Sequence, residues 1–156
     1  MPAAQSRPAA HVVGDRDAIA IGEGLLDRSL PVRAWTHEAH CIATVFLMRM
    51  HPDLDLSRQL PKLIRAYNEA TGVPNSDTRG YHETITQFYI RAIAYGLARQ
   101  PSGLGLGEAC TRLIASPFGA RDLPLTFYSR ERLFSVEARR IWIAPDLREL
   151  DLEGIG

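Results

Sequence analysis

Apolar residues recur every three to four positions along most of the chain, whereas no stretch alternates apolar and polar residues for long enough to build a sheet. This spacing is typical of helices that bury one face. The sequence therefore predicts an all-α fold, a compact single-domain bundle of five or six helices with an irregular C-terminal tail. The domain is expected to span residues 15–156, after a disordered N-terminal arm formed by residues 1–14.

Prolines, glycines and capping residues set the expected helix limits. A short first helix follows Asp15, and Thr36 is a good N-cap for a second helix that runs to about His51. A third helix lies between residues 53 and 72, a fourth runs from about 80 to 99 with Asp77 or Thr78 as its cap, and a fifth covers about 106–115. Residues 124–128 are expected to be extended, followed by short helical turns over 130–140 and an apolar tail, 141–145, that packs back on the bundle.

Two short stretches concentrate the chemistry, namely residues 35–40 (WTHEAH) and 75–84 (NSDTRGYHET). Each stretch opens a predicted helix and places histidine and glutamate beside aromatic residues. Together they hold three of the five histidines of the chain. We interpret the two helix starts as walls of one polar site.

The second helix is apolar on nearly all sides except for one narrow stripe. His37, His40, Thr44 and His51 fall on a single line of its surface. This stripe is either a thin solvent-facing strip on a core helix or a polar seam that points into a cavity. For His51 the sequence favours the solvent-facing alternative.

His82 lies in the apolar arc of the fourth helix, and Glu83 lies at the edge of that arc. A histidine in such a place is either a core residue satisfied by one hydrogen bond or part of a site. Both alternatives stay open from the sequence alone.

A metal site is one hypothesis for these residues. Histidines three positions apart share one face of a helix, so His37 and His40 are candidate ligands, with His82 as a third. A set of histidines with an open position would suit a divalent transition metal such as zinc or iron. Glu83 is the alternative third ligand, and Asp77 and Glu38 are reserves.

The same residues also suit acid/base catalysis without a metal. Helix N-termini carry free N–H groups and a partial positive charge, which attract anions and keep histidine neutral. The catalytic candidates are His37, His40, His82, Glu83 and Tyr81. The candidates for substrate binding are Asn68, Asp77, Arg130 and Arg132, and Arg139 joins them if the tail folds over the site, although these arginines also fit a solvated face with ion pairs.

Charge and cysteine content narrow the class of protein. Lys+Arg and Asp+Glu balance at 18 each, which argues against binding to nucleic acid or to a membrane surface. Cys41 and Cys110 make no disulfide framework, residues 1–14 lack the apolar segment of a signal peptide, and the longest apolar run is too short to span a bilayer. We therefore expect a cytoplasmic protein with reduced thiols.

These features predict a small-molecule enzyme that uses the His/Glu cluster at the two helix starts, with or without a metal. One alternative is a metal-free acid/base catalyst acting on an anionic small molecule. The other is a non-catalytic binding module or accessory subunit, whose interface with a protein partner or a second copy would include Phe134 and Trp142.

Four blocks of sequence resemble a family of small bacterial proteins, namely WTHEAH, YNEATG, NSDTRGYHET and FYSRERLFSVEAR. The resemblance covers roughly residues 35–146. It implies an all-helical domain and no particular reaction. It also implies a shared pattern, to which these residues belong: Trp35, His37, Glu38, His40, Asn68, Asp77, Gly80, Tyr81, His82, Glu83, Thr84, Tyr128, Ser129, Arg130 and Arg132.

Overall fold

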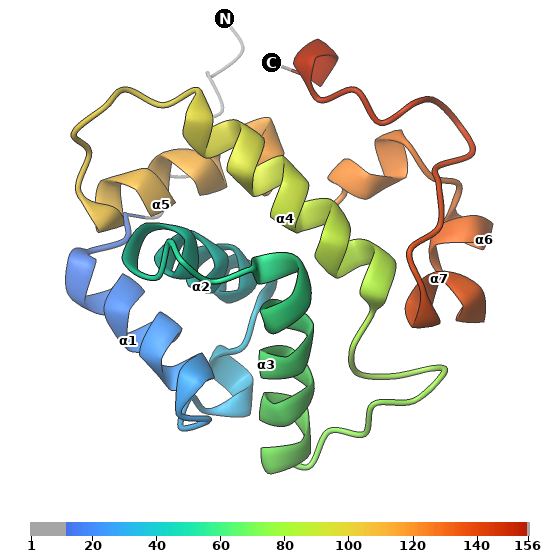
Figure 1. The fold of residues 1–156 in the computed structure, drawn as a ribbon, viewed down its shortest axis with the longest axis horizontal. Helices are drawn as coiled ribbons and strands as arrows, with labels where there is room; N and C mark the ends of the chain where they lie inside the picture. The colour runs from blue at the N-terminus through green and yellow to red at the C-terminus, as the bar shows by residue number, and fades with distance from the viewer. Residues whose placement is uncertain (1–11, 156) are drawn as a thin grey trace, which may run out of the picture.

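A computed structural model describes residues 12–155 of the chain. Within this range all regular elements are helical and no strand is present, which confirms the all-α prediction (Figure 1). The α-helices are α1 (Asp15–Leu26), α2 (His37–Met50), α3 (Leu56–Ala70), α4 (Glu83–Ala98), α5 (Leu106–Ala115), α6 (Arg130–Leu133) and α7 (Val136–Arg140). Four 3₁₀ turns join them, namely η1 (Val32–Ala34), η2 (Pro117–Gly119), η3 (Leu123–Thr126) and η4 (Glu153–Ile155). Five helices are long, and α6 and α7 are short additions of four and five residues.

The helix α2 forms the centre of the bundle. It contacts α1, α4 and α5, and its residues 41–47 are all buried (Figure 1). Gly22 lets α1 lie close to α2, because a Cβ atom at this position would overlap the ring of Phe46. The C-terminal helix α7 packs against α4. The molecule is therefore a core of long helices with a short-helix appendage on the α4 side.

The N-terminal segment joins the core earlier than the sequence predicts. Val13 is buried, and its backbone N–H donates to the Thr111 hydroxyl over 2.9 Å. Residues 12–14 were expected to belong to a disordered arm, and the rest of that arm, residues 1–11, lies outside the described residues.

The start of α4 differs from its predicted position. The helix begins at Glu83 with His82 as its N-cap, in place of Asp77 or Thr78. Gly80 has a φ of 84°, which is the left-handed region and interrupts any helix that starts earlier. The preceding loop is instead folded around Asn75, whose side-chain oxygen accepts from the Tyr81 N–H and from the Asn68 amide.

The C-terminal part wraps back onto α4, as the apolar tail predicted. Thr84 is fully buried, and its hydroxyl donates to the Ile141 carbonyl over 2.8 Å and accepts from the Ile143 N–H over 3.2 Å. Residues 123–126 form the 3₁₀ turn η3 where an extended segment was expected, because Pro124 suits the first turn of a helix. The wrap brings η3, α6 and α7 beside the start of α4.

Candidate functional site

A cleft of 520 Å³ opens where the starts of α2 and α4 face the C-terminal segment. All three histidines of the two predicted stretches are among the residues that line it. The complete lining is Trp35, His37, His40, Gly80, His82, Ile85, Tyr89, Arg121, Pro124, Leu125, Leu133, Phe134 and Arg139.

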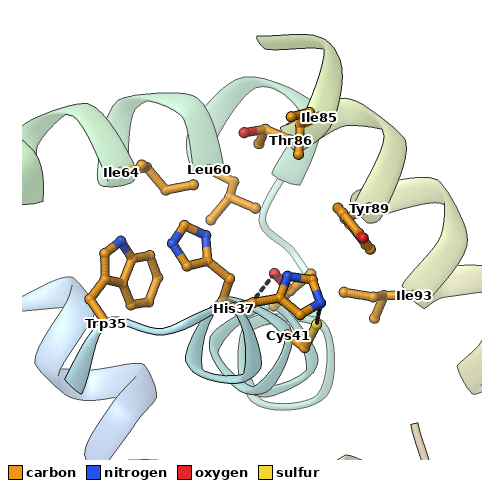
Figure 2. A pocket seen from close by; sticks show the side chains of 11 residues that line it. Trp35, His37, Cys41, Leu60, Ile64, Ile85, Thr86, Tyr89 and Ile93 are labelled. Carbon is orange, nitrogen blue, oxygen red and sulfur yellow. Dashed lines mark hydrogen bonds between the residues drawn. The ribbon is translucent and has the colours of Figure 1, made fainter. Parts of the chain in front are cut away.

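A smaller compartment of 70 Å³ adjoins the cleft and shares five of its residues, namely Trp35, His37, His40, Ile85 and Tyr89. Its remaining walls come from α2, α3 and α4. Figure 2 shows His37 and Cys41 on the α2 side, with Ile85, Thr86 and Tyr89 facing them from α4. The stripe of His37, His40 and Thr44 therefore points into a cavity, whereas His51 is exposed, as the sequence favoured.

His40 has no hydrogen-bond partner at either ring nitrogen among the described residues. Its ring stacks on Trp35 with 3.7 Å between centroids, which fixes the imidazole plane. Burial, and secondarily the charge of a protonated His37, lowers the pKa of His40 to about 3. His40 is therefore a neutral imidazole whose nitrogens are available to a ligand.

His37 is held by one of its two nitrogens. Its Nε2 lies 2.9 Å from the Gly119 carbonyl oxygen, which can only accept, so Nε2 carries a proton. In the neutral imidazole Nδ1 is then an acceptor, and no partner for it is present in the described part of the chain. The ring also meets Tyr89 edge-on, with 5.1 Å between centroids. His37 can thus accept a hydrogen bond in the cleft without leaving its position.

Cys41 lies beside His37 but is not set up as a nucleophile. Its sulfur is 3.6 Å from His37 Nε2, the nitrogen that donates to Gly119. A protonated nitrogen cannot take the thiol proton. Burial also raises the pKa of Cys41 to about 12, so the thiolate, which is the reactive form, does not accumulate near neutral pH.

His82 has a structural role that uses both ring nitrogens. Nδ1 accepts from the Ile85 N–H over 3.1 Å and caps α4, while Nε2 donates to the Leu133 carbonyl over 2.8 Å. Burial lowers the pKa of His82, the bond to Leu133 opposes this, and the charge of Arg139 lowers the pKa further. The sequence alternative of a core histidine satisfied by hydrogen bonding therefore describes His82 well.

Tyr81 and Glu83 face a different part of the molecule. The Tyr81 hydroxyl donates to the Glu83 carboxylate over 2.9 Å, and the Gln87 amide donates to the same carboxylate over 2.8 Å. Neither Tyr81 nor Glu83 is among the described residues that line the cleft or the compartment. The predicted pairing of Glu83 with the histidines in one site is thus not seen, because its carboxylate is engaged by its own helix and by Tyr81.

Three of the four predicted substrate-binding residues form contacts within the loop before α4 or with the C-terminal segment. Asn68 is buried and donates to Asn75, and Asp77 forms an ion pair with Arg140 at 2.6 Å on the surface. Arg132 donates to the Ala144 carbonyl over 2.7 Å, and Arg130 is exposed. None of these four residues lines the cleft, among those that the structure describes.

Two other arginines line the cleft, namely Arg121 and Arg139. Arg139 was a candidate because of its place in the tail, and it donates to the Gly80 and Tyr81 carbonyls. Arg121 was not predicted. It lies in an irregular segment between η2 and η3, where no periodicity indicates which way a side chain points.

The predicted metal ligands do not form a metal site. Over residues 12–155 no three His, Cys, Asp or Glu side chains are grouped so that they could hold one ion. His82 would have to give up its cap on α4 or its bond to Leu133 in order to join His37 and His40. In the structure His37 and His40 share the wall of the cleft, and His82 is the cap of α4.

Comparison with known proteins adds no relative: no protein-family model, no curated protein and no solved structure matches the chain. The resemblance to a family of small bacterial proteins stays a prediction. Among the described residues, no helix combines the length and the apolar character needed to span a bilayer.

Proposed function

We propose that the protein is a small-molecule enzyme in which His40 transfers a proton at the wall of the cleft. The observation that carries this proposal is the state of the His40 ring. Its nitrogens have no partner within the described residues, yet the ring is oriented by Trp35 and lines both the cleft and the compartment. An oriented imidazole with a free ring nitrogen next to a cavity can reach a bound substrate and exchange a proton with it.

In this proposal the substrate displaces water from the cleft and presents an acidic C–H, N–H or O–H group to His40. A ring nitrogen of His40 accepts the proton with its lone pair, and the resulting imidazolium returns it to another atom of the substrate. The free protein keeps this histidine neutral by burial. A negative charge that develops on the substrate next to the ring favours the protonated form, so the basicity of His40 rises during the reaction.

His37 assists as a fixed acceptor. Its Nε2–H is tied to Gly119, so its Nδ1 lone pair is directed by the protein and can hold a donor group of the substrate. Tyr89 supports the same wall, because its hydroxyl donates to the Ala120 carbonyl over 2.6 Å and so anchors the segment that follows Gly119. Neither role requires a change in the backbone.

The test is turnover in a bacterial metabolite extract, followed by mass spectrometry of untargeted compounds. We expect the wild-type chain to consume or isomerise at least one compound, and His40→Gln to slow that change by roughly 10²–10⁴-fold, which is the usual contribution of an acid/base group. His51→Gln is the matched control, because His51 lies at the exposed end of the same helix. Equal rates in wild type and His40→Gln would refute the role of His40.

A non-catalytic accessory subunit is the second candidate. It is favoured by exposed apolar side chains, since Phe134, which lines the cleft, is 56% exposed and Ile141 is 53% exposed. Trp142, which was expected in this interface, is instead half-buried with Arg91 over its ring at 4.3 Å. Purification from the native host with a stoichiometric protein that is lost in Phe134→Ser would support this candidate.

A further inference from the structure

We infer that the ligand of the cleft is a monocarboxylate with an apolar end, which names the substrate class of the proposed enzyme and rests on that proposed function. The carboxylate would lie against Arg121 and Arg139 at the cleft, and the apolar end would enter the compartment behind His40. Three features of the described residues lead to this conclusion, namely the charge of the cleft, the free donors of its arginines and the character of the compartment.

The cleft is positively charged. Arg121 and Arg139 are its cationic residues, and no aspartate or glutamate is among the described residues that line it. Burial keeps His40 and His82 neutral by lowering the pKa of each. Two guanidinium groups next to low-dielectric walls attract an anion more strongly than they would in open solvent.

Both arginines that line the cleft have side-chain donors without partners among the described residues. Arg121 makes no hydrogen bond or ion pair with its side chain in the range 12–155. Arg139 uses Nη1 for the carbonyls of Gly80 and Tyr81, at 3.0 and 3.3 Å, which leaves Nε and Nη2. A guanidinium fork binds the two oxygens of a carboxylate in a bidentate manner. A carboxylate presents both of its oxygens in the plane of such a fork, and the alkyl phosphate of the same length is the competing anion in the test below.

The walls and the volume of the compartment indicate the size and polarity of the apolar end of the ligand. Its walls include Leu60, Ile64 and Ile93, and Cys41 there is an uncharged thiol. Its 70 Å³ is about half of the roughly 150 Å³ that holds a benzene molecule in an engineered apolar cavity. A branched alkyl group or the end of a short alkyl chain therefore fits, and a complete aromatic ring does not.

The first experiment measures binding without turnover. Probes are butanoate, hexanoate, octanoate and decanoate, each paired with its primary amide and with the alkyl phosphate of the same length, titrated into the ¹⁵N-labelled full chain by NMR. We expect the carboxylates to shift resonances at the cleft and to bind at least tenfold more tightly than the amides. Arg121→Gln should weaken carboxylate binding by about tenfold, which corresponds to one charge-assisted contact.

The matched control is Arg130→Gln, since Arg130 is also exposed but does not line the cleft. Its carboxylate affinity should equal that of wild type. Equal affinity for amide and carboxylate, an equal loss in Arg121→Gln and Arg130→Gln, or tighter binding of the alkyl phosphate would each overturn the inference.

The second experiment fills the compartment. Thr44→Leu adds volume from α2, and Ile93→Phe adds it from α4, so that one variant remains informative if the other fails to fold. Either folded variant should lose the gain in affinity that longer chains show over butanoate, while butanoate itself binds as before. An unchanged dependence on chain length would place the apolar end elsewhere and contradict the inference.

These outcomes separate the ligand class from the reaction. Carboxylate binding that depends on Arg121, without any turnover that depends on His40, would uphold the ligand class and refute the proposed enzyme. Turnover that depends on His40 but acts only on neutral or cationic compounds would uphold the enzyme and refute the ligand class.

Discussion

The starts of α2 and α4 have similar sequences, and each presents a histidine to the same cleft, but the two histidines differ in every contact. His82 uses one nitrogen to cap α4 and the other to hold Leu133. His40 stacks on Trp35 and uses neither nitrogen within the described residues. The cap of α2 is supplied by Thr36, whose hydroxyl accepts from the Ala39 N–H over 3.2 Å.

The difference shows that the choice of N-cap residue decides whether a ring nitrogen of a nearby histidine is used to cap the helix. Where a threonine caps the helix, the histidines of the first turn are not needed as the cap, and their rings can line a cavity. Where the histidine itself is the cap, as His82 is, both ring nitrogens are engaged by backbone groups and neither is available to a ligand. The two stretches that looked alike therefore differ: His40 has ring nitrogens without a partner among the described residues, whereas both ring nitrogens of His82 are engaged.

The largest effect that tests this division is the loss of stability in His82→Ala. The substitution removes the cap of α4 and leaves the Leu133 carbonyl without its donor in a buried place. A cap contributes about 1 kcal/mol, and an unsatisfied buried group costs roughly 1–3 kcal/mol, so we expect a loss of about 2–4 kcal/mol in urea unfolding.

His40→Ala and His82→Asn are its controls. His40→Ala removes only the contact with Trp35 and should lower the free energy of unfolding by about 1 kcal/mol or less. His82→Asn keeps a good N-cap and should recover about 1 kcal/mol of the loss in His82→Ala. Similar losses in His82→Ala and His40→Ala would erase the distinction between the two helix starts.

The next effect is the pH dependence of stability. The pKa of His40 is about 3 in the folded chain and near its ordinary 6.5 when unfolded, so below pH 6.5 the unfolded state binds more protons. The stability that depends on neutral His40 is complete above pH 6.5 and is lost as the pH falls toward 3. At pH 5 the expected loss is about 2 kcal/mol.

Urea unfolding near neutral pH and near pH 5 measures whether the free energy of unfolding falls as the pH is lowered. His82 contributes in the same direction, because its pKa is also lowered, so wild type should lose more than the share of His40 alone. His40→Gln should remove that share, whereas His51→Gln should behave as wild type does. An identical pH dependence in wild type and His40→Gln would show that His40 is not held neutral by the fold.

The helices could be predicted from the sequence because their signals are local. Thr36 caps α2 as expected, and the prediction for α5 agrees with its observed limits, since glycine, proline and apolar spacing act over a few residues. The start of α4 could not be placed, because it depends on Asn75 accepting hydrogen bonds from both Asn68 and Tyr81. That arrangement joins segments whose approach no local pattern encodes.

The site was predicted only where helical periodicity carries the information. His37, His40 and Thr44 share a line on α2, and they line the compartment. Arg121 reaches the cleft from an irregular segment, and Glu83 turns toward Tyr81 and Gln87, so neither placement follows from a helical wheel. The irregular segment decides the direction of Arg121, and hydrogen bonds with its near neighbours Tyr81 and Gln87 decide that of Glu83.

A smaller effect is expected for the hydrogen bond between Tyr81 and Glu83, which lies outside the cleft. Tyr81→Phe removes the hydroxyl that donates to Glu83, and the net value of such a bond is about 1–3 kcal/mol because the acceptor is charged. We expect a loss of stability at the low end of this range, since Gln87 still donates to the carboxylate. Turnover should stay within about twofold of wild type, because the pair does not line the cleft. A drop in rate as large as that of His40→Gln would return Tyr81 and Glu83 to the catalytic group.

The smallest effect, and the sharpest check on the α2 side of the comparison, concerns Cys41. If this thiol were the reactive group of the compartment, His37 would have to take its proton, but His37 Nε2 already donates to Gly119. Burial raises the pKa of both Cys41 and Cys110 to about 12, so we expect neither thiol of the folded chain to react with iodoacetamide near neutral pH, and both to react in urea. Cys41→Ala should keep turnover far above that of His40→Gln, because no proton transfer in the proposal depends on the thiol, and Cys110→Ala is the buried control outside the compartment. Rapid alkylation of Cys41 alone, together with loss of turnover in Cys41→Ala, would transfer the chemistry from His40 to a cysteine–histidine pair.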